Sequence, residues 1–368
     1  MNIAAIAGST IPSDTANSLQ VMKACQALLQ LGHDVTLLVP GFKNSSVDLK
    51  EHYGLQTEFP IEWLASASRR RFTWEAVRCA QLGGHDLIYS WFPQSAVFGL
   101  LRRLPVVFEV HIQPTGLFGP MWHRLFAQIR GRKRLVAITR ALVDLLRGDF
   151  RMHVSDEEIV IAPNGVDLER FASLPDPVTA RRRTGLPEAP TVMCTGHLYA
   201  GRGADLFLGL AKRFPYARFV WVGGRPEDVQ SWKERLESDN VIFTGFIPNS
   251  ELPLYQAAAD ILLLPYGRSI MGSSGTADSA RVASPMKMFE YMAAGRAILS
   301  ADLPVIREVL NENNAAFCEP GELESWQTTL EALLQDQSRR MILGEQAKRD
   351  AQRYTWLARA ERILNGFV

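Results

Sequence analysis

The segment "NIAAIAGSTIPSDTANSLQVMKACQALLQLGHDVTLLV", residues 2–39, decides the fold class. Its first apolar run ends at Gly8 and predicts a buried strand, and the apolar run at 33–39 predicts a second one. Between these runs, leucines and methionines recur at helical spacing until Gly32, which is a typical helix stop. A strand, a helix and a strand in this order form a βαβ unit, which implies a parallel sheet.

The same alternation of short apolar runs and helical patterns continues along the chain. Further strands are predicted at residues 86–91, 105–111, 134–139, 159–165, 191–196, 218–224, 241–245, 261–266 and 297–301. The stretch 167–190 is rich in Pro and Arg and weak in periodicity, so we interpret it as a hinge region. We therefore expect an α/β protein with two Rossmann-like lobes whose parallel sheets face a central cleft.

The expected lobes divide the chain into three segments. These are an N-terminal lobe at 1–172, a C-terminal lobe at 173–350, and a C-terminal helix at 351–368 that crosses back to the N-terminal lobe. Ligands bind such sheets beyond the carboxyl ends of the strands. The loops that follow the strands are therefore where polar side chains matter most.

Composition excludes several classes of protein. A length of 368 residues favours two domains, and a net charge of +1 offers no global field for nucleic acid. The four cysteines lie far apart without metal-ligand spacing, which is typical of reduced cytosolic thiols. No apolar run approaches the roughly 18–20 residues that span a bilayer, and the opening residues lack the basic region of a signal peptide. We expect a cytoplasmic protein.

Two loops carry candidate anion-binding groups. The loop after 191–196 holds His197 and Arg202, and Gly203 precedes a helix. Helix beginnings present free N–H groups to anions, and an arginine adds a cation suited to phosphate. A surface loop with a solvated arginine is the alternative for this stretch alone.

The second candidate is "SPMKMFEYMAAGRAIL", residues 284–299. Pro285 suits a helix start, so backbone donors near Ser284 and Met286, together with the charge of Lys287, can hold a phosphate. Glu290 lies three residues further on and can accept hydrogen bonds from the two hydroxyls of a ribose. The alternative is an ordinary surface pair between Lys287 and Glu290. The apolar neighbours are expected in the core.

Four stretches in a fixed order resemble the retaining glycosyltransferases of family 4. They are "IAPNGVDLERF" at 161–171, the loop around Arg202, "VIFTGFIP" at 241–248, and residues 284–299. The resemblance covers essentially the whole chain and implies the GT-B fold. It also implies a nucleotide-sugar donor, UDP-linked by the habit of the family, which the C-terminal lobe binds.

The resemblance assigns donor-binding roles in the C-terminal lobe. His197 and Arg202 occupy the positions of the family's basic pair for the diphosphate, and the histidine is a departure from the usual arginine. Glu290 matches the ribose-binding glutamate, and Lys287 adds charge at the phosphates. The remaining donor-binding candidates are Gly245, Phe246 and Ile247 at the nucleobase, and Ser284, Pro285 and Met286 at the phosphates. The family commonly has a second glutamate where this chain has Val282, and Asp278 and Ser284 are the candidates to replace it.

The N-terminal lobe supplies the remaining candidates. His111 ends a predicted strand and matches the active-site histidine of the family, whereas a structural histidine is the alternative. Glu109 is expected on the opposite face of that strand. In the loop after the first strand, Gly8 permits close approach, and Asn17 is placed to bind acceptor or phosphate. Helix capping is the competing interpretation for Asn17 and its neighbours Ser13 and Asp14.

The resemblance also implies a mechanism. The sugar is transferred with retained configuration by same-face attack, without a protein nucleophile. Arg202 and Lys287 would then stabilise charge on the leaving diphosphate, with His111 as the third catalytic candidate. No Asp-x-Asp triplet occurs in the sequence, and we expect neither a metal nor a cofactor beyond the donor.

The acceptor is expected to be a glycan or a lipid-linked saccharide. Residues 121–134 place Met121, Trp122, Leu125, Phe126 and Ile129 on one helical face beside a run of arginines and a lysine. Such a basic amphipathic segment can contact an anionic membrane at the inner face of the cell. A domain helix packed with its apolar side inward is the alternative.

Other functional classes remain open. Val282 and His197 also fit a non-catalytic nucleotide-sugar-binding or scaffold subunit of a glycan-assembly complex. A sugar-nucleotide epimerase shares the two-lobed fold but arranges carboxylates in its cleft. A nicotinamide dehydrogenase is disfavoured because no G-x-G-x-x-G follows the first strand.

Overall fold

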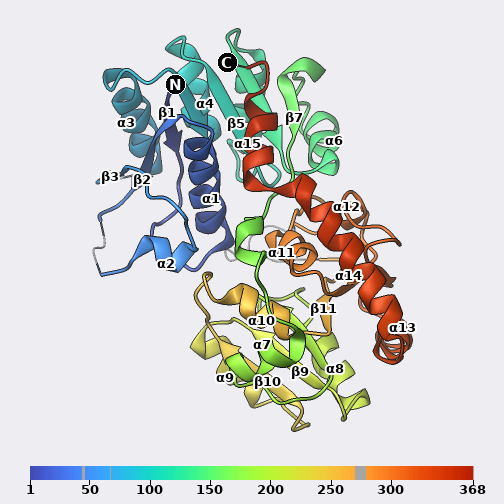
Figure 1. The fold of residues 1–368 in the computed structure, drawn as a ribbon. Helices are drawn as coiled ribbons and strands as arrows, with labels where there is room; N and C mark the ends of the chain where they lie inside the picture. Colours follow the sequence, from blue (N-terminus) through green and yellow to red (C-terminus); the bar gives the residue numbers. More distant parts are fainter. Residues whose placement is uncertain (44–45, 67, 270–278, 368) are drawn as a thin grey trace. The chain divides into compact units, whose positions relative to one another are not determined.

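The computed structural model describes residues 1–43, 46–66, 68–269 and 279–367. The chain forms two compact units, each with its own parallel sheet (Figure 1). The first unit contains Met1–Asn164 and Trp356–Val368, and the second contains Gly165–Thr355. The chain thus changes units after 164 and after 355, whereas the sequence analysis placed these changes after 172 and after 350.

The sheet of the first unit has seven strands in the order β3-β2-β1-β4-β5-β6-β7. Its strands are β1 (Asn2–Ile6), β2 (Asp34–Pro40), β3 (Ile61–Leu64), β4 (Leu87–Ser90), β5 (Val106–Val110), β6 (Lys133–Ala137) and β7 (Ile159–Ile161). Its helices are α1 (Ala16–Gln30), α2 (Leu49–Tyr53), α3 (Arg69–Leu82), α4 (Pro93–Leu101), α5 (Gly119–Gln128), α6 (Arg140–Gly148) and α15 (Trp356–Leu364), with a 3₁₀ turn at Asp156–Glu158.

The opening βαβ unit forms as the sequence predicts. β1 pairs in parallel with β2 and with β4, and its apolar side chains are buried. α1 begins at the Thr15 N-cap, whose hydroxyl accepts a hydrogen bond from the Ser18 backbone N–H. Helix α15, the last helix of the chain, lies beside α1 in this unit (Figure 1). Segments from the two ends of the sequence therefore build one core.

The sheet of the second unit has six strands in the order β10-β9-β8-β11-β12-β13. Its strands are β8 (Thr191–Thr195), β9 (Arg218–Val222), β10 (Val241–Gly245), β11 (Ile261–Leu264), β12 (Ala297–Ala301) and β13 (Ala316–Cys318). Its helices are α7 (Pro177–Thr184), α8 (Ala204–Arg213), α9 (Pro226–Lys233), α10 (Leu252–Ala258), α11 (Met286–Ala294), α12 (Pro304–Arg307), α13 (Leu323–Gln335) and α14 (Gln337–Ala351), with 3₁₀ turns at Leu168–Phe171 and Gln352–Tyr354.

The interpretation of 167–190 as a hinge is wrong. Most of this stretch packs inside the second unit, where α7 lies against α10. Arg181 anchors it, because its guanidinium donates to Asp260 at 3.0 Å and to the carbonyl of Ala258 at 2.9 Å. One of the prolines that suggested a linker, Pro177, instead starts the helix, where a missing backbone N–H costs nothing.

Candidate functional site

The sheet of the second unit has its switch point between β8 and β11. The chain leaves β8 toward β9 on one side and leaves β11 toward β12 on the other. The loops after these two strands touch each other, since the Gly267 N–H donates to the Gly201 carbonyl at 3.0 Å. A β-carbon at Gly203 would lie 2.0 Å from the Pro265 carbonyl oxygen. Only glycine permits this close packing, which presents both loops at the same edge of the sheet.

Two cations converge at this edge. The guanidinium carbon of Arg202 lies 5.7 Å from the ring centre of Tyr266, and the Lys287 ammonium nitrogen lies 4.8 Å from it. Rings attract cations at such distances, so both cationic groups lie within reach of one phenol ring. Within the described residues, neither cation forms an ion pair with a carboxylate. Paired positive charge at a switch point is suited to binding a diphosphate.

The position of Lys287 is set by the end of β8. Its ammonium donates to the Thr195 carbonyl at 3.0 Å and contacts the Cys194 sulfur at 3.5 Å. Tyr291, one turn further along α11, accepts the Thr195 backbone N–H at 2.7 Å and thereby fixes the helix against the strand. α11 begins at Met286 without a side-chain cap, so its positive end lies beside the buried lysine.

Glu290 is buried on the same helix, and its carboxylate accepts a hydrogen bond from Gln256 of α10 at 3.1 Å. The alternative of a surface pair between Lys287 and Glu290 is therefore wrong, because both side chains are buried and bond to other groups. The apolar neighbours on α11 belong to the core, as expected: Met288, Phe289, Tyr291 and Met292 have no measurable exposure.

The other donor-site candidates lie around the same edge. His197 follows β8 and stacks on Tyr199, with ring centres 4.9 Å apart. Gly245 ends β10 with a φ of 75°, and Phe246 follows it with half of its surface exposed. Ile247 is partly exposed beside it. The three residues therefore form a loop at the carboxyl end of an outer strand, which is compatible with the proposed contact to a base.

The Gly/Ser-rich connection before α11 is described only in part. Asp278 lies outside the described residues. Val282 is buried at 1% exposure, so the position of the missing glutamate is occupied by an apolar core residue. Ser284 is buried at 6%, Pro285 is the N-cap of α11, and Met286 is its first residue. The phosphate-binding candidates therefore gather at the start of this helix.

In the first unit, the expectation that Glu109 and His111 lie on opposite faces is wrong. Side chains two positions apart on a strand point to the same side, and the Nε2 atom of His111 lies 2.5 Å from the Glu109 carboxylate. Glu109 also accepts hydrogen bonds from Gln20 at 2.6 Å, from Arg359 at 2.7 and 3.2 Å, and from the Tyr89 hydroxyl.

Charge explains the ionisation of this cluster. Burial alone would raise the pKa of Glu109, but the Arg359 guanidinium and the His111 hydrogen bond outweigh it and hold this pKa well below its ordinary value. Burial and the neighbouring carboxylate raise the pKa of Tyr89, which therefore donates as a neutral phenol. Glu109 is a carboxylate that accepts three hydrogen bonds at Oε1 and two at Oε2.

In the loop after β1, the space beside Gly8 is already filled by a side chain. The ring of Phe92 occupies the space beside Gly8, where a β-carbon would lie 1.9 Å from the ring. The close approach that glycine permits at Gly8 is therefore made by an aromatic side chain. Asn17 is exposed and accepts a hydrogen bond from the Ser9 hydroxyl. Thr15 is the N-cap residue of α1, whereas the sequence analysis considered Ser13, Asp14 and Asn17 for capping.

The basic amphipathic segment 121–134 is only partly exposed. Phe126 is fully buried, and the Lys133 ammonium donates to three carbonyls at the end of α5 at 2.6–3.1 Å. Arg134 donates to the carbonyls of Ile363 and Asn365. The last two cations of the run therefore hold the fold together. The exposed apolar side chains lie at the start of α5 instead, at Leu117, Phe118 and Met121.

Comparison with known proteins extends these observations. The family described as Glycosyltransferase Family 4 matches residues 19–170, and the family described as Glycosyl transferases group 1 matches residues 189–336. Together the two matches cover most of both units. The chain belongs to the family 4 glycosyltransferases.

Curated relatives of this chain include two proteins named as sugar transferases. Sulfoquinovosyl transferase SQD2 of Arabidopsis thaliana is 24% identical over 76% of this chain and 56% of its own length. Phosphatidyl-myo-inositol mannosyltransferase of Mycolicibacterium smegmatis is 24% identical over 94% of this chain and 87% of its own length. The chain spans only about half the length of the first two curated relatives it matches, at 56% and 52%.

Solved structures identify the fold as GT-B. Anabaena Alr3699/HepE in complex with UDP matches with a TM-score of 0.74 at 17% identity, covering 100% of this chain and 99% of the other. A glycosyltransferase from Rickettsia africae matches with a TM-score of 0.78 at 12% identity, covering 100% and 97%. At these identities the likeness establishes the architecture of this family 4 member and no more.

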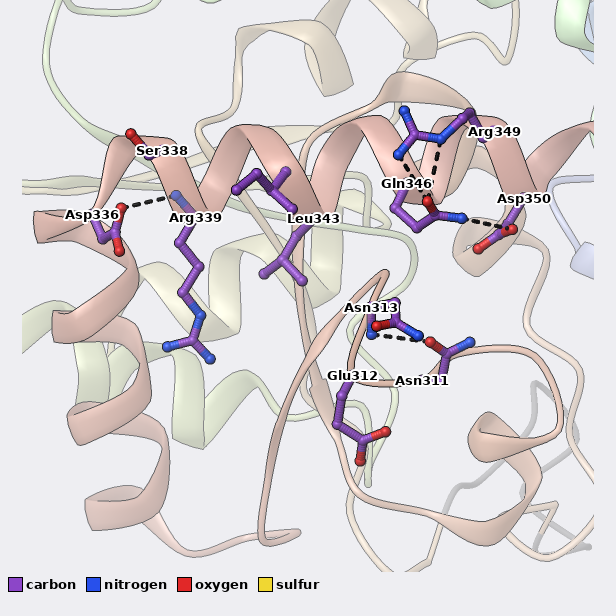
Figure 2. A pocket seen from close by; sticks show the side chains of 11 residues that line it. Asn311, Glu312, Asn313, Asp336, Ser338, Arg339, Leu343, Gln346, Arg349 and Asp350 are labelled. Carbon is purple, nitrogen blue, oxygen red and sulfur yellow. Dashed lines mark hydrogen bonds between the residues drawn. The ribbon is translucent and has the colours of Figure 1, made fainter.

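One pocket lies apart from the candidate site of this family 4 member. It has a volume of about 670 Å³ and lies between α14 and the loop Asn311–Asn313 (Figure 2). None of the candidate donor-site residues lines it. Within the described ranges, no cluster of His, Cys, Asp and Glu is arranged to hold a metal ion. Among the same residues, no helix is both long and apolar enough to cross a membrane.

Several residues that the structure brings to the two sites were not predicted from the sequence. Tyr266 lies directly after β11, where the rule about strand ends applies, but a tyrosine carries no charge that marks it as a phosphate-site residue. Gln256 is a polar residue inside an apolar helix, which is the signal that could have revealed it. Arg359 lies 250 residues from Glu109, and no local pattern links them.

Proposed function

We propose that this protein transfers a sugar from a nucleotide-diphosphate sugar to a glycan or lipid-linked acceptor, in the synthesis of a surface polysaccharide or glycolipid. The observation that carries the proposal is the convergence of Arg202 and Lys287 over Tyr266 at the switch point of the second sheet. Glu290, on the same helix as the lysine, supplies a carboxylate for the ribose hydroxyls. UDP is the proposed nucleotide, because Anabaena Alr3699/HepE, which shares the fold, has been solved in complex with UDP.

The proposed mechanism retains the anomeric configuration. The leaving diphosphate develops charge as the sugar–phosphate bond breaks, and Arg202, Lys287 and the positive end of α11 stabilise that charge. The acceptor oxygen bonds to the anomeric carbon on the face from which the diphosphate leaves, and a donor phosphate oxygen takes the acceptor proton. The protein therefore supplies neither the nucleophile nor the base. His111 contributes from the first unit as a polar group toward a sugar hydroxyl. No metal and no further cofactor are part of the proposal.

Nucleotide binding tests the donor site directly. A thermal-shift panel of UDP, GDP, ADP and UDP-glucose should show stabilisation by one nucleotide, since a ligand at 100 times its Kd adds roughly 2.7 kcal/mol. Arg202→Ala and Glu290→Gln should abolish the shift. Arg213→Ala removes an exposed arginine from the end of α8 and is the matched control. A shift that survives in the two site variants would refute the assignment.

A second candidate function rests on Val282. Because this position is a buried valine, the chain lacks the usual carboxylate beside the donor sugar, which fits a non-catalytic nucleotide-sugar-binding or scaffold subunit. Radiolabelled UDP-glucose separates the two functions. Release of UDP, by transfer or by slow hydrolysis, supports an enzyme, whereas saturable binding without any release supports the scaffold.

We also propose a cytoplasmic location with contact to the inner face of the membrane. Leu117, Phe118 and Met121 are 87%, 51% and 42% exposed, and the Arg70 guanidinium lies 6.0 Å from the Phe118 ring centre. Apolar side chains beside cations are suited to an anionic lipid surface. This exposed apolar group replaces the longer segment 121–134 as the proposed contact.

Vesicle flotation tests the membrane contact. Leu117→Ser with Phe118→Ser should reduce binding to phosphatidylglycerol vesicles, and added salt should weaken the binding of the unmodified protein. Leu82→Ser is the control. It removes a leucine that is 76% exposed at the end of α3, far along the helix from Arg70, and should leave binding unchanged. Equal recovery with neutral and anionic vesicles would refute the proposal.

A further inference from the structure

Glu109 is the centre of a buried hydrogen-bond cluster that no candidate role explains. Its side chain has no exposed surface, yet it accepts hydrogen bonds from four residues on four separate segments. They are Gln20 on α1, Tyr89 on β4, His111 directly after β5, and Arg359 on α15. We call these five residues the Glu109 cluster. A buried carboxylate is costly unless donors and a countercharge surround it, so the fold maintains this one against a large desolvation cost.

Arg359 supplies the countercharge. Its two terminal nitrogens bind the carboxylate at 2.7 and 3.2 Å, and its Nε atom donates to the Pro163 carbonyl at 2.9 Å. A bidentate guanidinium–carboxylate pair fixes the relative orientation of the two planar groups and also neutralises the charge of the carboxylate. Gln20 and Tyr89 then hold the carboxylate from two further sides. The orientation of Glu109 is therefore set by the core of the first unit.

The ionised state of Glu109 determines the proton position on His111. An ionised carboxylate accepts hydrogen bonds and cannot donate. The short contact of 2.5 Å between the His111 Nε2 atom and Glu109 therefore requires the proton on Nε2. In a neutral imidazole the Nδ1 atom is then the acceptor. Among the described residues no second group hydrogen-bonds to the ring, and 17% of the side chain remains exposed.

We propose that Glu109 is a positioning residue that holds His111 in the Nε2–H tautomer, so that Nδ1 presents an acceptor to a sugar hydroxyl. The Glu109–Arg359 pair is the fixed part of this arrangement, and His111 is the part that meets the ligand. The role of His111 toward a sugar rests on the proposed function. The tautomer and its cause rest on the Glu109 cluster alone.

The tautomer is measured without any assumption about the reaction. Long-range ¹H–¹⁵N spectra of the full chain at about pH 8, above the ordinary histidine pKa of about 6.5, distinguish Nε2–H from Nδ1–H. The His111 signals are assigned by their loss in His111→Gln. We expect a single Nε2–H tautomer. An Nδ1–H tautomer, or a mixture of the two, would overturn the proposal.

A double variant then removes the cause. Glu109→Met with Arg359→Met replaces the buried pair by apolar side chains of similar volume, which proteins often tolerate. We expect His111 to lose its single tautomer while the far-UV spectrum and the melting transition persist. Arg181→Met with Asp260→Asn alters an ion pair in the other unit whose side chains are 8% and 20% exposed, and is the control. A single Nε2–H tautomer in a folded Glu109/Arg359 variant would overturn the assigned cause.

Turnover links the cluster to the reaction. With UDP-glucose hydrolysis as the probe, the double variant should lower kcat about tenfold, equivalent to one lost hydrogen bond, with KM unchanged. In the His111→Gln background the same change should cause no further loss, because Glu109 acts through His111. Additive losses would contradict the positioning role. Absence of hydrolysis in the unmodified protein would refute the proposed enzyme and leave the tautomer result standing.

Discussion

Replacing Lys287 by Met should weaken nucleotide binding without harming the fold. Lys287 is 8% exposed, and Arg202 lies at the same tyrosine ring. Among the described residues, the hydrogen-bond partners of the Lys287 ammonium are a carbonyl and a thiol sulfur. Such a cation costs free energy in the unliganded protein, because no described carboxylate neutralises it. Its arrangement is therefore explained by a ligand that carries the missing negative charge.

Lys287→Met is expected to weaken UDP binding but not to lower the stability of the fold. A hydrogen bond to a charged group contributes about 1.5–3 kcal/mol, so loss of the ammonium should weaken UDP binding about 10- to 150-fold. The free energy of unfolding should stay within about 1 kcal/mol of the unmodified value or rise, because methionine fills the same space without a charge to desolvate.

Calorimetric titration with UDP and urea unfolding measure the two quantities on the same samples. Lys212→Met is the matched control, because Lys212 is an exposed lysine at the end of α8 that pairs with Glu237. The control should bind UDP like the unmodified protein. If Lys287→Met bound UDP within about threefold of the unmodified protein, the phosphate role of this lysine would be refuted. A loss of several kcal/mol in stability would instead show that its main role is structural.

Three further predictions concern the stability of the two units. Gly203→Ala should lower the free energy of unfolding by at least about 2 kcal/mol, because the new β-carbon meets the Pro265 carbonyl. Gly32 has a similar φ but open space around it, so Gly32→Ala should lower the free energy of unfolding by less in the same urea experiment. Lys133→Met should lower the free energy of unfolding by about 2–3 kcal/mol, because three carbonyls at the end of α5 lose their hydrogen-bond donor. An unchanged urea midpoint would contradict this. The folded pKa of Glu109 is lowered, so its contribution to the free energy of unfolding is complete above the ordinary glutamate pKa of about 4.3 and is lost as the pH falls toward the folded pKa. Urea unfolding of Glu109→Gln between about pH 2 and 6 should therefore show a smaller loss of stability with falling pH than the unmodified protein.

The parallel sheets could be predicted because their strands are buried on both faces. Central strands such as β1, β8 and β11 are short continuous apolar runs, which the sequence displays directly. The outer strands β3 and β13 were missed, because β3 contains a glutamate and is partly exposed, and β13 (Ala-Phe-Cys) has no β-branched residue. Edge strands need less apolar surface, and their pairing depends on the neighbour that is already in place.

The candidate site was predictable only where the chemistry is local. Arg202, Lys287 and Glu290 lie in loops or helix starts that follow strands, so position and residue type together indicated them. Tyr266 and Gln256 depend on which loops and helices the fold brings together. The hinge interpretation failed for a related reason, because proline content marks the start of α7 as readily as it marks a linker.

The discontinuity of the first unit has a consequence for how the protein is made. The countercharge of Glu109 lies 250 residues further along the chain, after the whole of the second unit. On the ribosome, the second unit is complete before Arg359 emerges, whereas the first must wait for the final helix. During that interval the carboxylate of Glu109 cannot pair with the Arg359 guanidinium. The order of synthesis therefore favours folding of the second unit first.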